Sequence, residues 1–252
     1  MKPLNLMALA ATCLIALSAC KPSADKPASS ATPDAPASQS TPAPSGSNSL
    51  QPSTSGEYSV LVIPQSVEQG NKVEVLEFFA YFCSHCKSFD PMLVDWAKKN
   101  AGKVIFKRVP VAFREDMIPQ QRMYYALEAM GKIDALHDKI FDAVQNQRRS
   151  LSTEAEILEF IGQHGVDKTK FKEVYDSFSV QSQARSAYNM QGSYKIDSVP
   201  NIAIDGRYMT SASHAQKRPG VEQSETGLRT ATLQIMDELV AKVLKDRPAV
   251  KK

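Results

Sequence analysis

Apolar residues along this chain follow two periods, and each period predicts a different element. Four runs rich in β-branched and aromatic residues predict strands, and they lie at residues 58–63, 72–82, 104–111 and 199–204. Between about residues 119 and 192 apolar positions recur every three or four residues, which predicts several amphipathic helices. A further helix is predicted around residues 228–243. Strands on both sides of a helical stretch indicate an α/β protein.

Short polar motifs predict several boundaries between these elements. Residues 152–156 (Ser-Thr-Glu-Ala-Glu) resemble a helix capping box, Gly165 is typical of a helix end, and Asp167 of a helix start. Asp205-Gly206 predicts a tight hairpin turn before a return strand. Residues 212–225 are polar and are expected to form a loop, to which we assign no role.

The N-terminal residues are typical of a secretion signal. Lys2 is followed by an apolar run at residues 4–17, which is too short to form a settled transmembrane helix. The run ends in Leu17-Ser18-Ala19-Cys20, which resembles a bacterial lipobox. We therefore expect residues 1–19 to be a lipoprotein signal peptide and Cys20 to carry acyl chains. An ordinary signal peptide with an incidental cysteine is the alternative.

A segment of low complexity follows at residues 20–56. It consists mainly of Ser, Ala, Pro, Thr and Gln, so it cannot bury a core and is expected to be a disordered linker. A flexible chain of this length spans on the order of 35 Å and would hold a domain away from a membrane. The remaining residues suit one globular domain.

Charge and cysteine content narrow the function further. The formal net charge is only +3, which does not point to nucleic acid. Of the four cysteines, Cys13 leaves with the signal peptide and Cys20 belongs to the lipobox, so Cys83 and Cys86 can pair only with each other. A secreted chain without a framework of structural disulfides favours a disulfide that does chemistry.

The motif Cys83-Ser84-His85-Cys86 lies where a predicted strand runs into a predicted helix. Two thiols at this spacing can close a disulfide within one helical turn, and the helix N-terminus favours a thiolate at Cys83. A metal-binding or structural pair is the alternative. Zinc needs two more ligands, and no ligand-like spacing to the motif is shown by His137, His164 or His214. We expect neither a metal nor a cofactor.

Several motifs together resemble the DsbA family of thiol oxidases. They are Glu77-Phe78-Phe79, Phe82-Cys83-Ser84-His85-Cys86, Val199-Pro200 and Asp205-Gly206-Arg207-Tyr208. The resemblance implies a thioredoxin fold with an inserted α-helical subdomain. The thioredoxin parts would be residues 57–113 and 193–252, and the insertion residues 114–192. The family has Pro more often than Ser at position 84, which bears on the redox potential.

The resemblance also implies roles for the motif residues. Cys83 would be the nucleophile and the attacked sulfur, and Cys86 its buried partner. His85 would stabilise the Cys83 thiolate, or else be a solvated histidine without a role. Glu77 would lie beneath Cys86 and relay a proton, or else be an exposed carboxylate at a sheet edge.

Val199 and Pro200 are expected to form the substrate-binding backbone. The resemblance implies a cis bond between them, which would place the Val199 backbone beside the disulfide. A substrate segment could add there as a short antiparallel strand. Val199 matches the oxidase type, since isomerase-type relatives more often have Thr.

The resemblance implies a periplasmic disulfide oxidase that is monomeric and lipid-anchored. It would donate the Cys83–Cys86 disulfide to folding secreted proteins with free thiols, through a mixed disulfide at Cys83. A DsbB-like integral membrane partner would reoxidise it, which favours the inner membrane over the outer. The alternatives are a reductase or isomerase of the same fold, and a non-catalytic metal-binding or surface lipoprotein. Isomerases carry a dimerisation domain where this chain has its linker.

Overall fold

The computed structural model describes residues 50–52, 56–68 and 70–247. The expected signal peptide (1–19), the lipidation of Cys20 and most of the expected linker (20–56) lie outside the described residues. Within the described part, no helix is both long enough and apolar enough to cross a membrane.

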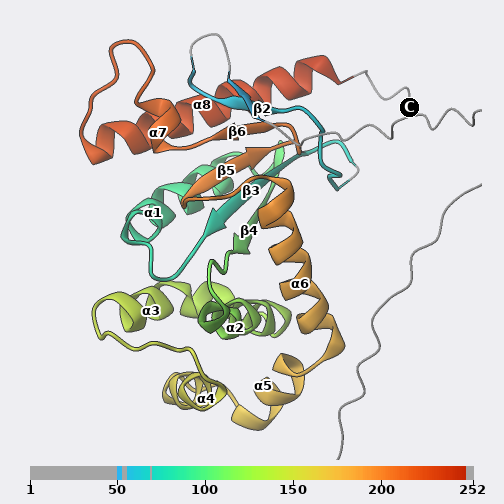
Figure 1. The fold of residues 1–252 in the computed structure, drawn as a ribbon, viewed down its shortest axis with the longest axis vertical. Coiled ribbons are helices and arrows are strands. Elements are labelled where there is room, and N and C mark those ends of the chain that lie inside the picture. The colour runs from blue at the N-terminus through green and yellow to red at the C-terminus, as the bar shows by residue number, and fades with distance from the viewer. Residues whose placement is uncertain (1–49, 53–55, 69, 248–252) are drawn as a thin grey trace, which may run out of the picture. The chain divides into compact units, whose positions relative to one another are not determined.

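Six strands of the described residues form one mixed sheet in the order β1-β2-β6-β5-β3-β4 (Figure 1). Their bounds are Leu50–Pro52 (β1), Ser59–Leu61 (β2), Val73–Phe79 (β3), Val104–Pro110 (β4), Asn201–Ile204 (β5) and Tyr208–Thr210 (β6). β3 pairs parallel with β4 and antiparallel with β5. All seven residues of β3 are buried, which explains the nearly continuous apolar run that predicted it.

Helices pack on both faces of this sheet. Their bounds are Ser84–Lys99 (α1), Glu115–Met117 (the 3-10 turn η1), Ile118–Ala129 (α2), Ile133–Gln145 (α3), Glu154–Gln163 (α4), Lys168–Tyr175 (α5), Phe178–Ser193 (α6), Ala212–Ala215 (α7) and Glu225–Asp246 (α8). Val75 of β3 belongs to one core with Leu93 of α1 and Ile235 of α8. Leu76 belongs to a second core that extends through Phe160 into the helices between β4 and β5. Neighbouring strand residues face opposite sides, so β3 separates the two cores.

The predicted caps and turn are confirmed. The side chain of Thr153 accepts from the backbone N–H of Glu156, and the Glu156 carboxylate accepts from the N–H of Thr153. The side chain of Asp167 caps α5 by accepting from the backbone N–H groups of Thr169 and Lys170. Asp205 and Gly206 have φ values of 55° and 63°, as a hairpin turn of the type I′ class requires.

Two stretches differ from the prediction. Residues 50–52 were expected within the disordered linker, but they form β1, which pairs antiparallel with β2. This pairing uses backbone groups, and an edge strand tolerates Pro52, so composition alone does not reveal it. The expected loop at residues 212–225 contains the short helix α7.

Candidate redox-active site

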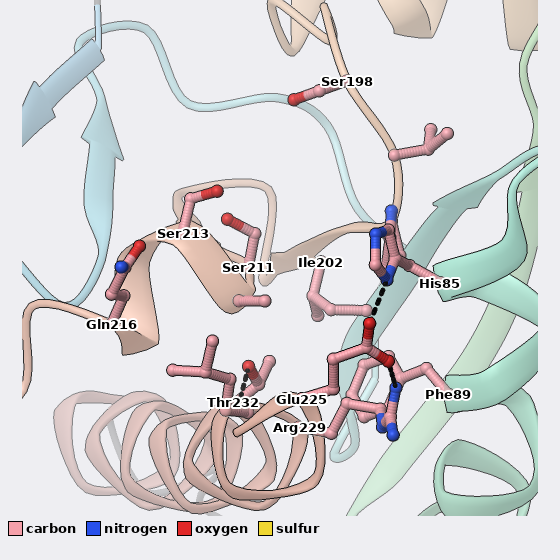
Figure 2. Close-up of a pocket in the computed structure, with 14 residues that line it drawn as sticks. His85, Phe89, Ser198, Ile202, Ser211, Ser213, Gln216, Glu225, Arg229 and Thr232 are labelled. Atoms are coloured by element: carbon pink, nitrogen blue, oxygen red, sulfur yellow. Dashed lines mark hydrogen bonds and ion pairs between the residues drawn. The ribbon is translucent and has the colours of Figure 1, made fainter. Parts of the chain in front are cut away.

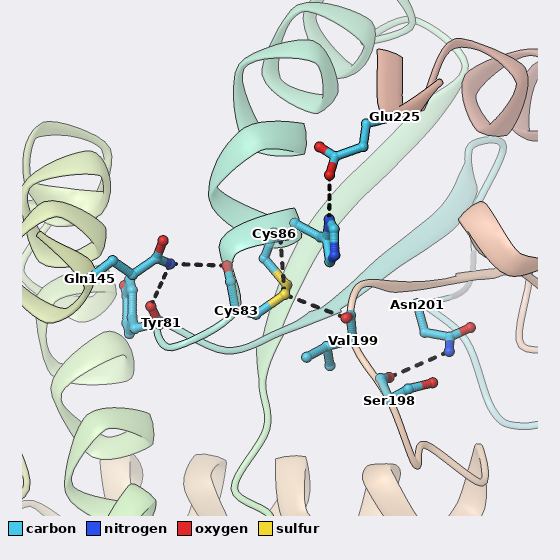
Figure 3. The surroundings of a disulfide bond; sticks show 9 residues. Tyr81, Cys83, Cys86, Gln145, Ser198, Val199, Asn201 and Glu225 are labelled. Atoms are coloured by element: carbon cyan, nitrogen blue, oxygen red, sulfur yellow. Dashed lines mark hydrogen bonds and ion pairs between the residues drawn. A yellow bond between two sulfur atoms is a disulfide. The ribbon is translucent and has the colours of Figure 1, made fainter. Parts of the chain in front are cut away.

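Cys83 and Cys86 form a disulfide at the start of α1, with Cα atoms 5.3 Å apart (Figure 3). Cys83 is the N-cap residue with an extended backbone, and the N–H of Cys86 points at its sulfur with an N···S distance of 3.0 Å. A helix N-terminus carries unpaired N–H groups and a partial positive charge. Residues 84–87 include no acidic side chain. The Cys83 sulfur therefore lies where a negative charge is stabilised.

The two sulfurs differ in accessibility. Cys83 retains 7% exposure, whereas Cys86 is fully buried beneath the first turn of α1. An incoming thiolate can therefore approach the disulfide at Cys83 and not at Cys86. Of the two sulfurs, that of Cys83 is therefore the more accessible from outside.

The predicted cis bond between Val199 and Pro200 is confirmed. The carbonyl oxygen of Val199 lies 3.4 Å from the Cys83 sulfur, although the two residues are 116 positions apart in the sequence. Figure 3 shows residues 198–201 passing beside the disulfide. The backbone of this segment therefore borders the reactive sulfur.

A cavity of about 270 Å³ lies next to this segment, between α1, α7 and α8 (Figure 2). Its apolar lining comes mainly from Phe89, Val199, Pro200, Ile202 and Leu228. Polar groups line the rest, from His85, Ser198, Ser211, Ser213, Gln216, Glu225, Arg229 and Thr232. The stretch 212–225, which we expected to be a loop without a role, thus supplies part of the wall.

His85 lies on the exposed first turn of α1 beside this cavity. Its Nδ1 is 3.9 Å from a carboxylate oxygen of Glu225 at the start of α8. The other oxygen of Glu225 accepts from Arg229 at 3.1 Å (Figure 2). His85 and Glu225 are each about two-thirds exposed, and exposed ion pairs are weak. The pair with Glu225 therefore holds His85 only weakly at the mouth of the cavity.

Glu77 is buried in the centre of β3, with 1% exposure. The alternative of an exposed carboxylate at the sheet edge is therefore wrong. Burial raises the pKa of Glu77 to about 8, while Arg108 lowers it and Asp90 raises it. The nearest charge is Nε of Arg108, 3.4 Å from Oε2 of Glu77. At neutral pH Glu77 is mostly protonated and can give up or receive a proton.

Three polar residues around Glu77 were missed by sequence reasoning: Asp90 and His137, which are buried, and Arg108, whose side chain is 11% exposed. Arg108 lies opposite Glu77 on β4 and donates from Nε and Nη2 to Oδ1 of Asp90, at 3.1 and 2.6 Å. Nε2 of His137 lies 3.4 Å from the same oxygen. Burial opposes ionisation of Asp90, but His137 and Arg108 hold its pKa below the usual range. The sequence indicated this polar cluster in one way: a cationic residue, Arg108, falls within the predicted strand 104–111.

Most of the predicted site residues come together in the fold. Residues from two segments far apart in the sequence meet at the disulfide: Cys83, His85, Cys86, Val199 and Pro200. Cys20 lies outside the described residues. In the part of the chain that the structure describes, no group of three or more His, Cys, Asp or Glu side chains is arranged to hold a metal ion.

These features define the class of protein. A Cys-x-x-Cys disulfide at a helix N-terminus, on a thioredoxin-like sheet and beside a cis-proline, is the arrangement of a thiol:disulfide oxidoreductase.

Comparison with known proteins specifies the family. Residues 74–219 match the model of the DSBA-like thioredoxin domain. The thiol:disulfide interchange protein DsbA of Burkholderia cepacia is 37% identical over 193 residues, which cover 76% of this chain and 86% of that protein. DsbA of Pseudomonas aeruginosa is 33% identical over 196 residues, 78% and 86% of the two chains. The chain therefore belongs to the DsbA family of thiol:disulfide oxidoreductases.

Solved structures agree with this family. The crystal structure of Pseudomonas aeruginosa DsbA superposes with a TM-score of 0.66 at 32% identity, covering 74% of this chain and 92% of that one. The oxidoreductase NmDsbA3 of Neisseria meningitidis gives a TM-score of 0.64 at 30% identity, covering 75% and 96%. The predicted fold class, a thioredoxin fold with inserted helices, is confirmed.

Proposed function

We propose that this chain donates its Cys83–Cys86 disulfide to secreted proteins that are still folding. A substrate thiolate attacks the sulfur of Cys83, the internal S–S bond breaks, and its electron pair leaves on the sulfur of Cys86. A second substrate thiolate then attacks the substrate sulfur of this mixed disulfide, and Cys83 leaves as a thiolate. Two electrons have passed from substrate to chain, the substrate holds a disulfide, and both cysteines are reduced.

One observation carries this proposal: the accessible sulfur of the disulfide caps the N-terminus of α1 and faces the N–H of Cys86. Both features stabilise a thiolate on Cys83. A stable thiolate is a good leaving group and favours the reduced chain, so the disulfide is donated readily.

The segment Val199–Pro200 is the proposed substrate-binding backbone. A substrate segment that adds to it as a short antiparallel strand brings its own cysteine to Cys83. The neighbouring cavity, lined by both apolar and polar residues, can hold a substrate side chain. Backbone pairing of this kind depends little on sequence, which suits a protein with many substrates.

His85 and Glu77 take supporting roles in this proposal. A protonated His85 stabilises the thiolate of Cys83. Glu77, with its pKa near neutrality, relays a proton to Cys86 when that sulfur leaves and takes one back when it attacks.

The cellular setting is proposed from the N-terminal sequence and the family. Removal of residues 1–19 leaves Cys20 as a lipidated N-terminus that holds a monomeric chain at a membrane facing the periplasm. Thioredoxin parts at residues 57–113 and 193–252 flank the helical insertion at 114–192. An integral membrane partner of the DsbB type reoxidises the cysteines, which favours the inner membrane.

Cysteine variants test the exchange mechanism. In Cys86→Ser, the Cys83 thiolate attacks a disulfide of an unfolded substrate protein, one substrate sulfur stays bound to Cys83 and the other leaves as a thiolate. No partner thiol releases Cys83, so these mixed disulfides should accumulate. They would appear on a gel as larger species that reductant removes. Cys83→Ser should form none of them and should lose oxidase activity. Oxidase activity that survives in Cys83→Ser would contradict the proposal. A wild-type chain without oxidase activity, whose cellular role is unchanged by Cys83→Ser, would favour a non-catalytic surface lipoprotein.

Fractionation tests the anchor separately. Cys20→Ala should move the chain from the membrane fraction to the soluble one. Cys13→Ala is the matched control, because Cys13 leaves with the signal peptide and its loss should not change the fractionation. A Cys20→Ala chain that has lost residues 1–19 and still stays with the membrane would rule out lipidation at Cys20 as the anchor.

A further inference from the structure

Helix α3 of the insertion contacts the redox turn through Gln145, its last residue. Nε2 of Gln145 donates to the carbonyl oxygen of Tyr81 at 2.8 Å and to that of Cys83 at 3.0 Å (Figure 3). These two carbonyls flank Phe82 in the turn between β3 and α1. A side-chain amide has two N–H bonds, so one group holds both carbonyls of the turn.

The same helix contacts α1 and the turn at further points. Asp142 lies 3.6 Å from Nζ of Lys87, and Nε2 of His137 lies 3.4 Å from Asp90. Nδ1 of His137 lies 3.0 Å from the hydroxyl of Tyr81. Because Nε2 of His137 faces the carboxylate of Asp90, which can only accept, the proton of His137 is assigned to Nε2, and Tyr81 donates to Nδ1. Tyr81 is thus held by α3 at both its hydroxyl and its carbonyl.

We propose that Gln145 is a positioning residue of the redox centre and makes the chain a stronger oxidant; the inference rests on the proposed function. The carbonyl oxygen of Cys83 carries partial negative charge and belongs to the residue that bears the reactive sulfur. In the oxidised chain that sulfur is neutral. In the reduced chain it becomes a thiolate and is repelled by the carbonyl. Donors on the carbonyl offset this repulsion, so they favour the reduced form selectively.

A purely structural role would have a different consequence. Hydrogen bonds that only hold the turn together stabilise the oxidised and the reduced chain equally. Their loss then lowers the stability of both forms but leaves the equilibrium between them unchanged. The redox equilibrium and the acidity of Cys83 therefore separate the two roles.

The equilibrium to measure is that between the oxidised chain plus two reduced glutathione molecules and the dithiol chain plus glutathione disulfide. Gln145→Ala should lower the constant for reduction of the chain about three- to tenfold and raise the measured pKa of the Cys83 thiol by about 0.5 to 1. Gln145→Glu places a negative charge at the same carbonyls and should shift both quantities further in the same direction.

Gln120→Ala is the matched control. Nε2 of Gln120 donates to the carbonyl oxygen of Ser150 at 2.7 Å, which is the same kind of bond in a loop away from the disulfide. This variant should lose stability without a change in the glutathione equilibrium. If Gln145→Ala does not fold, Gln145→Met is measured instead. The methionine side chain has a similar length but no N–H donors.

The outcomes separate the two proposals. A wild-type chain that neither exchanges with glutathione nor oxidises a reduced substrate protein contradicts the proposed function itself. If the wild type does both, and Gln145→Ala or Gln145→Met shows the same equilibrium constant and the same Cys83 pKa, the positioning role of Gln145 alone is wrong.

Discussion

Glu77 is a carboxylic acid inside a buried strand, and its titration should affect the stability of the whole fold. Burial raises its pKa from 4.5 to about 8. Between these values the native chain holds a proton that the unfolded chain has released, so the stabilisation is complete below about pH 4.5 and is lost as the pH rises toward 8. The free energy of unfolding should fall by up to about 1.4 kcal/mol per pH unit in this window.

A Glu77→Gln variant tests this titration, because the amide does not ionise. Denaturant unfolding of the oxidised chain should show a smaller fall between about pH 5 and pH 8 than the wild type. At the upper pH the variant should be the more stable of the two. Glu159→Gln is the control, since its side chain is 64% exposed. Parallel pH profiles for wild type and Glu77→Gln would show that Glu77 does not titrate in this range.

At the scale of elements, the turn between β5 and β6 depends on one glycine. Gly206 has a φ of +63°, and a Cβ there would lie 2.3 Å from the carbonyl oxygen of Gln65. Gly206→Ala should therefore cost more than about 2 kcal/mol in unfolding free energy, from backbone strain and from the clash together. Gly165→Ala should cost only about 1 kcal/mol. Its φ is +74°, but its Cβ would meet no described atom within 4 Å. Equal losses in denaturant unfolding would exclude the clash.

Elements whose structure depends on neighbouring residues were predictable from the sequence. The site was less predictable, because its contacts join residues that are far apart in the chain. The capping box at Thr153 and the turn at Asp205-Gly206 use only neighbouring residues, so their motifs predict them. The approach of Val199 to Cys83 spans 116 residues, and only the family resemblance supplied it. Gln145 has no distinguishing motif, because its two acceptors are backbone carbonyls of a turn far away in sequence.

For the molecule as a whole, the redox state of the disulfide and the stability of the fold are linked. The Cys83–Cys86 loop has a sequence separation of only 3, so closing it stabilises the oxidised chain by about 2 kcal/mol through chain entropy. Each unit by which the fold lowers the pKa of the Cys83 thiol stabilises the reduced chain by about 1.4 kcal/mol. Because an ordinary thiol, with a pKa of about 8.5, is protonated at neutral pH, only the depression below the ambient pH counts. A Cys83 pKa more than about 1.5 units below the ambient pH therefore makes the reduced chain the more stable one.

An oxidase should consequently gain stability when it is reduced. We expect the denaturant midpoint of the chain at neutral pH to be higher in excess dithiol reductant than in the oxidised state. The reason is that only the reduced fold contains the stabilised thiolate of Cys83. The double variant Cys83→Ser/Cys86→Ser should unfold at the same midpoint with and without reductant. A midpoint that falls on reduction would mean that the fold favours the disulfide, and the reductase alternative would then replace the oxidase. The sign of this one shift therefore fixes the direction in which electrons flow through Cys83 and Cys86.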